Sequence, residues 1–168
     1  DSYAKFDQGT LIGDRLANSI YTKSKRGVIF WGTVRNIQEI KKVDGFNGWI
    51  LGDHPSSINE MMLTSINAPI RVGDVTVLPG DVVFASPYGT IFFPAYLVEE
   101  IVLEAEISNL RHVFGIMRVR AGDWTTGQID SEYTPQMTKE FYDYLRKRSD
   151  TELPMSRKEL NGYLETHQ

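Results

Sequence analysis

Apolar residues in the first third of the chain alternate between helical and strand-like spacing. Leu16, Ile20 and Tyr21 recur at helical spacing, whereas the run Val28-Ile29-Phe30-Trp31 is short and β-branched, as in a buried strand. The predicted elements are, in order, a mixed segment at 1–8 that ends a strand begun upstream and becomes an edge strand if the upstream part is missing, a helix at 14–25, a strand at 28–31, a short helix at 36–42 and a strand at 48–51. This mixture of buried strands and amphipathic helices is typical of an α/β fold.

Residues 68–93 are rich in turn signals and short apolar runs. Two strands, 68–72 and 75–78, flank the two-residue turn Gly73-Asp74, which is a hairpin pattern. Two more strands, 82–85 and 90–93, are separated by Pro87-Tyr88-Gly89. Four short strands so close together predict one compact, partly antiparallel sheet.

The C-terminal part is predicted to be helical. Apolar residues between 95 and 120 trace one face of a long amphipathic helix, and a break near Ser108 is compatible with the pattern. Core packing or a subunit contact explains that face, and its glutamates are interpreted as solvated surface. Residues 124–133 read as a loop.

Two further helices follow. Pro135 lies in the first turn of a predicted helix that ends near Arg148, and Ser156 with Glu159 forms a capping box that opens the last helix. We therefore expect a core at residues 1–122 and a helical extension at 123–168 that serves in docking or oligomer contacts.

The composition is that of an ordinary globular protein. Of 168 residues, 41% are hydrophobic and 24% are charged, which suffices for a sizeable core. The formal net charge is -4 and the Lys and Arg residues are scattered, so the basic surface of a nucleic-acid-binding protein is missing. No apolar run approaches the ~18 residues of a membrane span. We expect neither nucleic acid nor membrane as a partner, with the cytoplasm as the default compartment.

The residue types also exclude several catalytic classes. The chain has no cysteine, which rules out disulfides, thiolate metal sites and a Cys nucleophile. His54, His112 and His167 lack the spacing that would put two histidines on one helix face. A Gly-x-Ser-x-Gly motif is also missing, so neither a histidine metal site nor a serine hydrolase of that kind is expected.

Arg35 follows the strand predicted around residues 28–31. In open α/β folds the C-terminal ends of strands gather polar groups around a ligand, and a guanidinium there is a candidate clamp for an anion. A second interpretation stays open. Asn36 and Glu39 have the spacing of a capping box, and Arg35 would then be a solvated ion-pair partner.

A glycine-bearing loop at residues 9–13 precedes the first predicted helix. Glycines before a helix start leave backbone N–H groups free to face an anion, which the helix dipole also favours. Alternatively, the carboxylate of Asp14 simply caps the helix. The pattern alone allows both an anion site and a capped helix.

Taken together, Gly13-Asp14, an interval of twenty residues, Arg35-Asn36 and then Glu39 resemble the signature of the RraA-like superfamily. The similarity continues through three further segments, residues 66–70, 77–83 and 88–94. This superfamily includes the regulator of ribonuclease activity A and the class II 4-hydroxy-4-methyl-2-oxoglutarate aldolases. Its members have often been mislabelled demethylmenaquinone methyltransferases, but the nucleotide-binding glycine loop of a methyltransferase is not found here.

The resemblance implies a fold and an assembly. The family fold is a swivelling β/β/α sandwich, with mixed sheets flanked by helices, in a homotrimer or hexamer. Its aldolases bind pyruvate or oxaloacetate between subunits, around Mg2+ or Mn2+. The fold of such members starts upstream of the Gly-Asp loop, so we expect this chain to be the C-terminal part of a longer member. The N-terminal part is then absent or supplied as a separate chain.

The resemblance also implies roles for individual residues. The glycine-rich loop and Arg35 would hold the substrate carboxylate, with Gly13, Arg15 and Leu16 as further binding positions. Asp14 would orient a metal-bound water that acts in proton transfer. Retro-aldol cleavage and decarboxylation both leave an enolate, whose charge a cation and fixed donors stabilise.

Two positions depart from the family pattern. The aldolases have Asp directly after the arginine as the metal ligand, whereas this chain has Asn36. The acidic residue common before the glycine of the strand is Trp31 here. A neutral amide oxygen supplies no charge, so affinity for Mg2+ or Mn2+ is expected to fall.

Two hypotheses follow from the sequence. The first is a metal-dependent aldolase or decarboxylase that acts on a pyruvate-related oxo acid, with Asp14 and Arg35 as catalytic residues and Asn36 at the metal position. The alternative is a non-catalytic member of the regulator type, which binds a small carboxylate or a protein partner.

Overall fold

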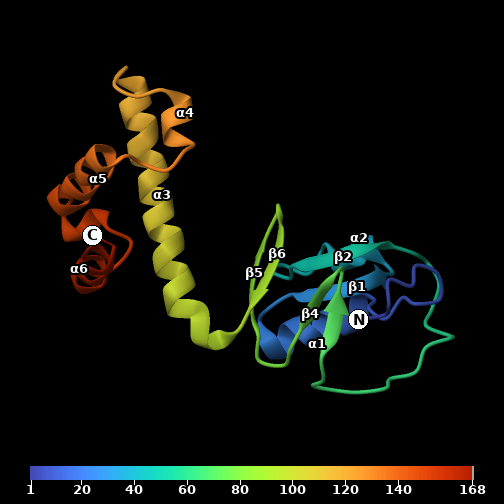
Figure 1. The fold of residues 1–168 in the computed structure, drawn as a ribbon. Coiled ribbons are helices and arrows are strands. Elements are labelled where there is room, and N and C mark those ends of the chain that lie inside the picture. Colours follow the sequence, from blue (N-terminus) through green and yellow to red (C-terminus); the bar gives the residue numbers. More distant parts are fainter. Residues whose placement is uncertain (168) are drawn as a thin grey trace. The chain divides into compact units, whose positions relative to one another are not determined.

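The structure is a computed structural model that describes residues 1–167. Contacts divide the chain into two compact units, Asp1–Ala95 and Tyr96–Gln168 (Figure 1). The first unit contains α1 (Asp14–Ser24), β1 (Val28–Val34), α2 (Ile37–Ile40), β2 (Gly48–Asp53), β3 (Ile70–Val72), β4 (Val75–Val77), β5 (Val82–Ser86) and β6 (Gly89–Phe93). After the short 3-10 turn η1 (Ala95–Leu97), the second contains α3 (Val98–Arg120), α4 (Thr126–Ile129), α5 (Pro135–Lys147), the 3-10 turn η2 (Asp150–Glu152) and α6 (Arg157–Thr166).

The core of the first unit forms where α1 packs against a parallel strand pair. Strands β1 and β2 run parallel, from Val28 opposite Gly48 to Val34 opposite Asp53. The buried apolar residues of this core are Ile12, Ala17, Phe30, Val34 and Ile40. The predicted helix at 14–25 and the predicted strand at 28–31 are confirmed. Strand β1 extends to Val34, so that Arg35 is the first residue beyond its C-terminal end.

The predicted four-stranded sheet is wrong in its pairing. Strands β3 and β4 form one antiparallel hairpin and β5 and β6 form another, without ladder bonds between the hairpins in the described residues. The β3 and β4 strands have three residues each, too short to bridge both neighbours. The indole Nε1 of Trp49 on β2 donates to the Ser86 carbonyl at 2.8 Å, which links the second hairpin to the parallel pair.

Residues 1–8 also differ from prediction, because they form turns instead of an edge strand. Tyr3, Ala4 and Gln8 have positive φ, which interrupts an extended backbone. The Ser2 side chain is buried and its Oγ donates to the Trp31 carbonyl at 3.0 Å. The segment is therefore attached to β1 by single hydrogen bonds and not by a strand ladder.

Helix α3 is continuous through Ser108, so the break that the sequence allowed does not occur. The predicted loop at residues 124–133 contains the short helix α4, which begins with a capping box between Thr125 and Gln128. The predicted capping box of Ser156 and Glu159 is confirmed at the start of α6.

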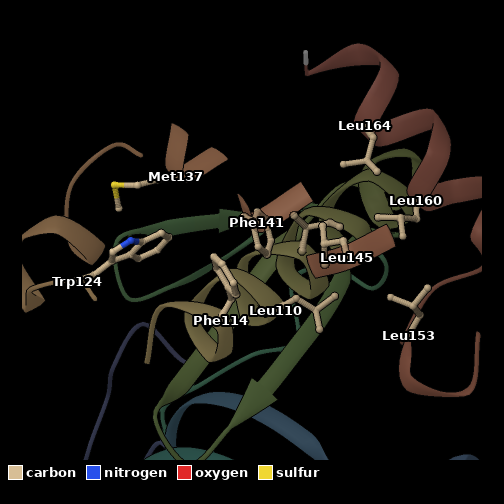
Figure 2. Packing of buried hydrophobic residues seen from close by; sticks show 10 residues of the cluster. Leu110, Phe114, Trp124, Met137, Phe141, Leu145, Leu153, Leu160 and Leu164 are labelled. Atoms are coloured by element: carbon tan, nitrogen blue, oxygen red, sulfur yellow. The ribbon is translucent and has the colours of Figure 1, made fainter. Parts of the chain in front are cut away.

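The helical unit has an aromatic and aliphatic core (Figure 2). Its buried residues are Ile107, Leu110, Phe114, Trp124, Met137, Phe141, Leu145, Leu153, Leu160 and Leu164. These side chains come from α3, α5, α6 and the connections between them, because each helix repeats its apolar residues at three- and four-residue spacing. By its packing, α3 thus belongs with the C-terminal helices. The predicted boundary between the family core and the helical extension, after residue 122, stays a prediction.

Within the described residues, every helix is too short or too polar to traverse a lipid bilayer.

Candidate functional site

The candidate site lies where the loop before α1 meets the end of β1. Ile12 and Val34 form an isolated parallel bridge, and the backbone N–H of Arg35 donates to the Ile12 carbonyl at 2.9 Å. This bridge puts residues 12–14 beside residues 34–36, although about twenty residues separate them along the chain. The two halves of the predicted signature are therefore brought together.

The side chain of Arg35 crosses directly over Gly13. A Cβ atom added at Gly13 would lie 3.1 Å from Nε and 3.3 Å from Cγ of Arg35. A side chain at position 13 would require Arg35 to shift by a few tenths of an ångström. Arg35 is partly buried, and its side-chain nitrogens make neither a hydrogen bond nor an ion pair with residues 1–167. Its five N–H donors therefore remain available for an anionic ligand.

Asp14 and Asn36 form a direct pair beside the arginine. The amide Nδ2 of Asn36 donates to Oδ1 of Asp14 at 2.7 Å. Asn36 has φ 58° and ψ 39°, a left-handed conformation that asparagine tolerates better than most residues. Its side chain does not cap α2, so the capping-box interpretation of Asn36 and Glu39 is wrong.

The start of α1 has no side-chain cap from its N-cap residue. Gly13 is the N-cap and supplies no side-chain cap, and Asp14 follows in the first helical turn. The alternative in which Asp14 acts as the N-cap residue is therefore not what the helix adopts. Arg15 is exposed and Leu16 is 41% exposed, so these two predicted binding positions lie on the open side of α1.

The hydrogen bond between Asn36 and Asp14 lowers the pKa of the Asp14 carboxyl group. The main cause is the hydrogen bond from Asn36, with smaller contributions from the backbone N–H groups of Asp14 and Arg15 and from the charge of Arg15. The Asp14 carboxylate therefore stays ionised well into the acidic range. It is an acceptor for a ligand hydroxyl group and repels a second carboxylate.

Replacing Asn36 with Ala should raise the pKa of Asp14 toward its ordinary value. A lowered folded-state pKa stabilises the protein above the unfolded pKa, and this contribution is lost as the pH falls through the folded value. The variant should therefore lose less stability than the wild type between about pH 4 and the lower folded pKa. Carboxyl NMR titration of Asp14 measures the shift directly, and an unchanged Asp14 titration would show that the pair does not form in solution.

A buried polar network behind the loop was not anticipated from the sequence. Thr10 and Thr33 are fully buried, with their hydroxyl oxygens 3.1 Å apart, and Thr33 Oγ1 donates to the Phe6 carbonyl at 2.7 Å. Ser56 lies 3.4 Å from Thr10 and 2.9 Å from Nδ1 of His54. The network fixes the loop before Gly13 to β1. Its signal in the sequence is weak, because isolated threonines carry no periodic pattern.

These residues do not fit a divalent ion held by the protein. Mg2+ and Mn2+ prefer oxygen ligands, including one or two carboxylates. Here Asn36 directs its amide N–H to the only carboxylate of the pair, so hydrogen-bond donors face the position that a bridging cation would need. Among residues 1–167, no three His, Cys, Asp or Glu side chains gather as a possible metal site.

The fold and site define a mixed α/β protein in which an arginine lies over a glycine at a helix start, beside an Asp–Asn pair. The family described as RraA-like, Aldolase/RraA, matches residues 3–92. The chain therefore belongs to the RraA-like family.

Curated relatives match about half of the chain. A Hahella chejuensis protein provisionally named 4-hydroxy-4-methyl-2-oxoglutarate aldolase is 32% identical over 87 residues, which cover 52% of each chain. A protein of the same provisional name from Ectopseudomonas mendocina is 29% identical and covers 52% of this chain and 53% of its own. The chain thus spans about half the length of the curated relatives it matches.

Solved structures support the fold. An uncharacterized protein from Pseudomonas syringae pv. tomato aligns with a TM-score of 0.62 at 21% identity, over 72% of this chain and 56% of that chain. RraAS2 of Streptomyces coelicolor, described as an unusual member of the RNase ES inhibitor RraA protein family, aligns with a TM-score of 0.60 at 27% identity, over 65% and 56%. The predicted α/β fold of the RraA type is confirmed.

Proposed function

We propose that this protein binds the carboxylate of a small oxo acid through Arg35 and the start of α1, without a divalent ion held by Asn36. The observation that carries the proposal is the Arg35 guanidinium, which lies across Gly13 and has no partner within residues 1–167. A guanidinium can hold a carboxylate through two parallel hydrogen bonds. The start of α1 adds a helix dipole, which favours negative charge at this end of the helix.

The Asp14–Asn36 pair narrows the class of ligand. Because Asp14 is ionised, a second carboxylate beside it is disfavoured, whereas a hydroxyl group there can donate a hydrogen bond. The ligand that fits is a small acid with one carboxylate at Arg35 and a hydroxyl or carbonyl group near the pair. The relatives' provisional name, 4-hydroxy-4-methyl-2-oxoglutarate aldolase, describes a compound with a hydroxyl and a carbonyl group, which also carries a second carboxylate.

Replacing Arg35 with Ala should weaken pyruvate binding by about 10- to 100-fold, because two charge-assisted hydrogen bonds are lost. Isothermal titration calorimetry without added metal measures the change. Arg26→Ala is the matched control. Arg26 is exposed, and its replacement removes the same charge at a position away from Gly13. Equal binding by wild type and Arg35→Ala would remove the basis of the proposal.

The second candidate function is a lyase that acts on a pyruvate-related oxo acid. It is favoured by the relatives, which carry an aldolase name. The family match over residues 3–92 also includes Asp14 and Arg35. In this case Arg35 would hold the carboxylate and stabilise developing negative charge, and Asp14 would act in proton transfer. The test is pyruvate release from oxaloacetate with and without Mg2+, with Arg35→Ala as the reference. If the wild type releases pyruvate no faster than Arg35→Ala, oxaloacetate is not its substrate. The proposal of carboxylate binding would still stand.

A further inference from the structure

The helical unit contains a cavity between α3 and the segment that follows α4 (Figure 1). Its volume is about 410 Å³, within the range of sites for small ligands. Gly115 of α3 lines the cavity, and a Cβ atom there would lie 3.1 Å from Oη of Tyr133 and 3.2 Å from Cγ2 of Ile129. The close approach of the two segments therefore depends on the glycine at position 115.

The guanidinium of Arg111 is held in place at this cavity. Its Cζ lies 3.9 Å from the centre of the Tyr133 ring, and Nη2 donates to the Ser131 carbonyl at 3.1 Å. Tyr133 in turn donates from Oη to the Arg111 carbonyl at 3.3 Å. Arg111 is partly buried, and within residues 1–167 it forms no ion pair and no other side-chain hydrogen bond. Its other N–H groups are therefore available for a carboxylate.

Two carboxylates line the same cavity. Asp130 and Glu132 lie on either side of Ser131, and both are exposed, so they line the cavity where it meets solvent. Neither carboxylate forms an ion pair or a side-chain hydrogen bond with the part of the chain that the structure describes. Ser108 and His112 add a hydroxyl group and an imidazole to the lining. One guanidinium and two carboxylates thus surround a single cavity without pairing with one another.

We propose that this cavity binds a free basic amino acid of the lysine type, with its carboxylate at Arg111 and its two ammonium groups at Asp130 and Glu132. One positive and two negative groups in the lining are complementary to a ligand with one negative and two positive groups. A small acid without an ammonium group is disfavoured, because the two carboxylates repel it. The cavity lies outside residues 3–92, which match the RraA-like family, so this proposal is independent of carboxylate binding at Arg35.

Three probes separate the contributions of the ligand's charges. L-norleucine is L-lysine without the side-chain ammonium group, and cadaverine is lysine without the carboxylate. L-norleucine should bind about two- to fivefold more weakly than L-lysine, since one exposed carboxylate of the cavity loses its partner. Cadaverine should bind at least about tenfold more weakly, since the charge-assisted hydrogen bonds to Arg111 are lost.

Nuclear magnetic resonance titration of the isotope-labelled full chain measures these affinities and locates the ligand. L-lysine should shift the backbone amide signals of residues 111–115 and 129–133. The absence of such shifts, or equal binding of the three probes, would overturn the proposal.

Replacing Arg111 with Gln should weaken L-lysine binding at least about tenfold and should not weaken cadaverine binding, because cadaverine has no carboxylate. Retained cadaverine binding also shows that the variant still folds. The double variant Asp130→Asn, Glu132→Gln should weaken the binding of both probes. Arg120→Gln is the matched control, because Arg120 is exposed on α3 and lies outside the cavity lining. L-lysine affinities of Arg111→Gln and Arg120→Gln that are equal would contradict the proposed role of Arg111.

The variant Arg35→Ala distinguishes this cavity from the candidate site of the first unit. It should bind L-lysine as the wild type does, because Arg35 belongs to the other unit. Loss of L-lysine binding in Arg35→Ala, with binding retained in Arg111→Gln, would place the ligand at the first site and make the present proposal wrong. Pyruvate binding that depends on Arg35 would be unaffected by either result.

Discussion

Replacing Asn36 with Asp is expected to create a binding site for Mg2+ or Mn2+. The variant puts a second carboxylate beside Asp14, in the position where Nδ2 of Asn36 now donates at 2.7 Å. Two adjacent carboxylates and water are oxygen ligands of the kind that these ions prefer, and ligand charge sets their affinity. We expect Mn2+ affinity to rise at least about tenfold, measured by electron paramagnetic resonance of the free ion.

The same variant should be less stable than the wild type when no metal is present. Two carboxylates in contact raise the pKa of at least one of them, so folding opposes ionisation. A raised folded pKa costs stability above the unfolded pKa, and the cost disappears as the pH falls below that value. Added Mn2+ should raise the melting temperature of Asn36→Asp at pH 7, because the ion binds only the folded state.

Asn47→Asp is the matched control for this experiment. It adds the same charge at an exposed asparagine of the first unit whose amide faces the Gly45 carbonyl at 3.4 Å. This control should show no gain in Mn2+ affinity. If Asn36→Asp behaves like Asn47→Asp, positions 14 and 36 do not form a joint site. If the wild type already binds Mn2+ as tightly as Asn36→Asp, the metal-free proposal is wrong.

Replacing Phe114 with Ala should destabilise the helical unit by about 3–5 kcal/mol. Phe114 is 3% exposed, and its ring lies 5.2 Å from Trp124, 5.6 Å from Phe141 and 4.8 Å from Tyr144, measured between centroids. The substitution removes a large apolar volume and these aromatic contacts, and the surrounding helices can fill the cavity only in part. Figure 2 shows Phe114 close to Phe141 in the packed cluster.

Chemical denaturation followed by tryptophan fluorescence measures this loss, since Trp124 contacts Phe114 directly. Phe84→Ala is the control with the same change of side chain, because Phe84 is 60% exposed on β5. It should cost less than about 1 kcal/mol. Equal effects of the two substitutions would mean that the aromatic cluster is not the core of the helical unit.

Local patterns predicted the local elements well. The helix starting at Asp14, the β1 strand, both hairpins and the capping box at Ser156 follow from side-chain periodicity and turn chemistry, which act within a few residues. Strand pairing was predicted less well. The two hairpins share no sheet because pairing depends on contacts between distant segments, as does the attachment of residues 1–8 to Trp31.

For the candidate site, too, the sequence predicted local features and left the contacts between distant residues open. Sequence spacing identified Gly13, Asp14, Arg35 and Asn36 as a group, through their resemblance to a family signature. It left open whether Asp14 and Asn36 capped their own helices. The structure decided this, because the bridge between Ile12 and Val34 brings Asn36 to Asp14 and leaves both helix starts without a side-chain cap.

By itself, then, the sequence determined the α/β class, the order of most of the elements, the family and the residues of the candidate site. Only the tertiary structure decided which side chains meet. It placed Arg35 over Gly13, joined Asp14 to Asn36, and buried one side of α3 while leaving the other side open. The physical reason is that periodicity and capping are encoded over one or two turns of chain, whereas the partner of a polar side chain depends on the packing of distant segments.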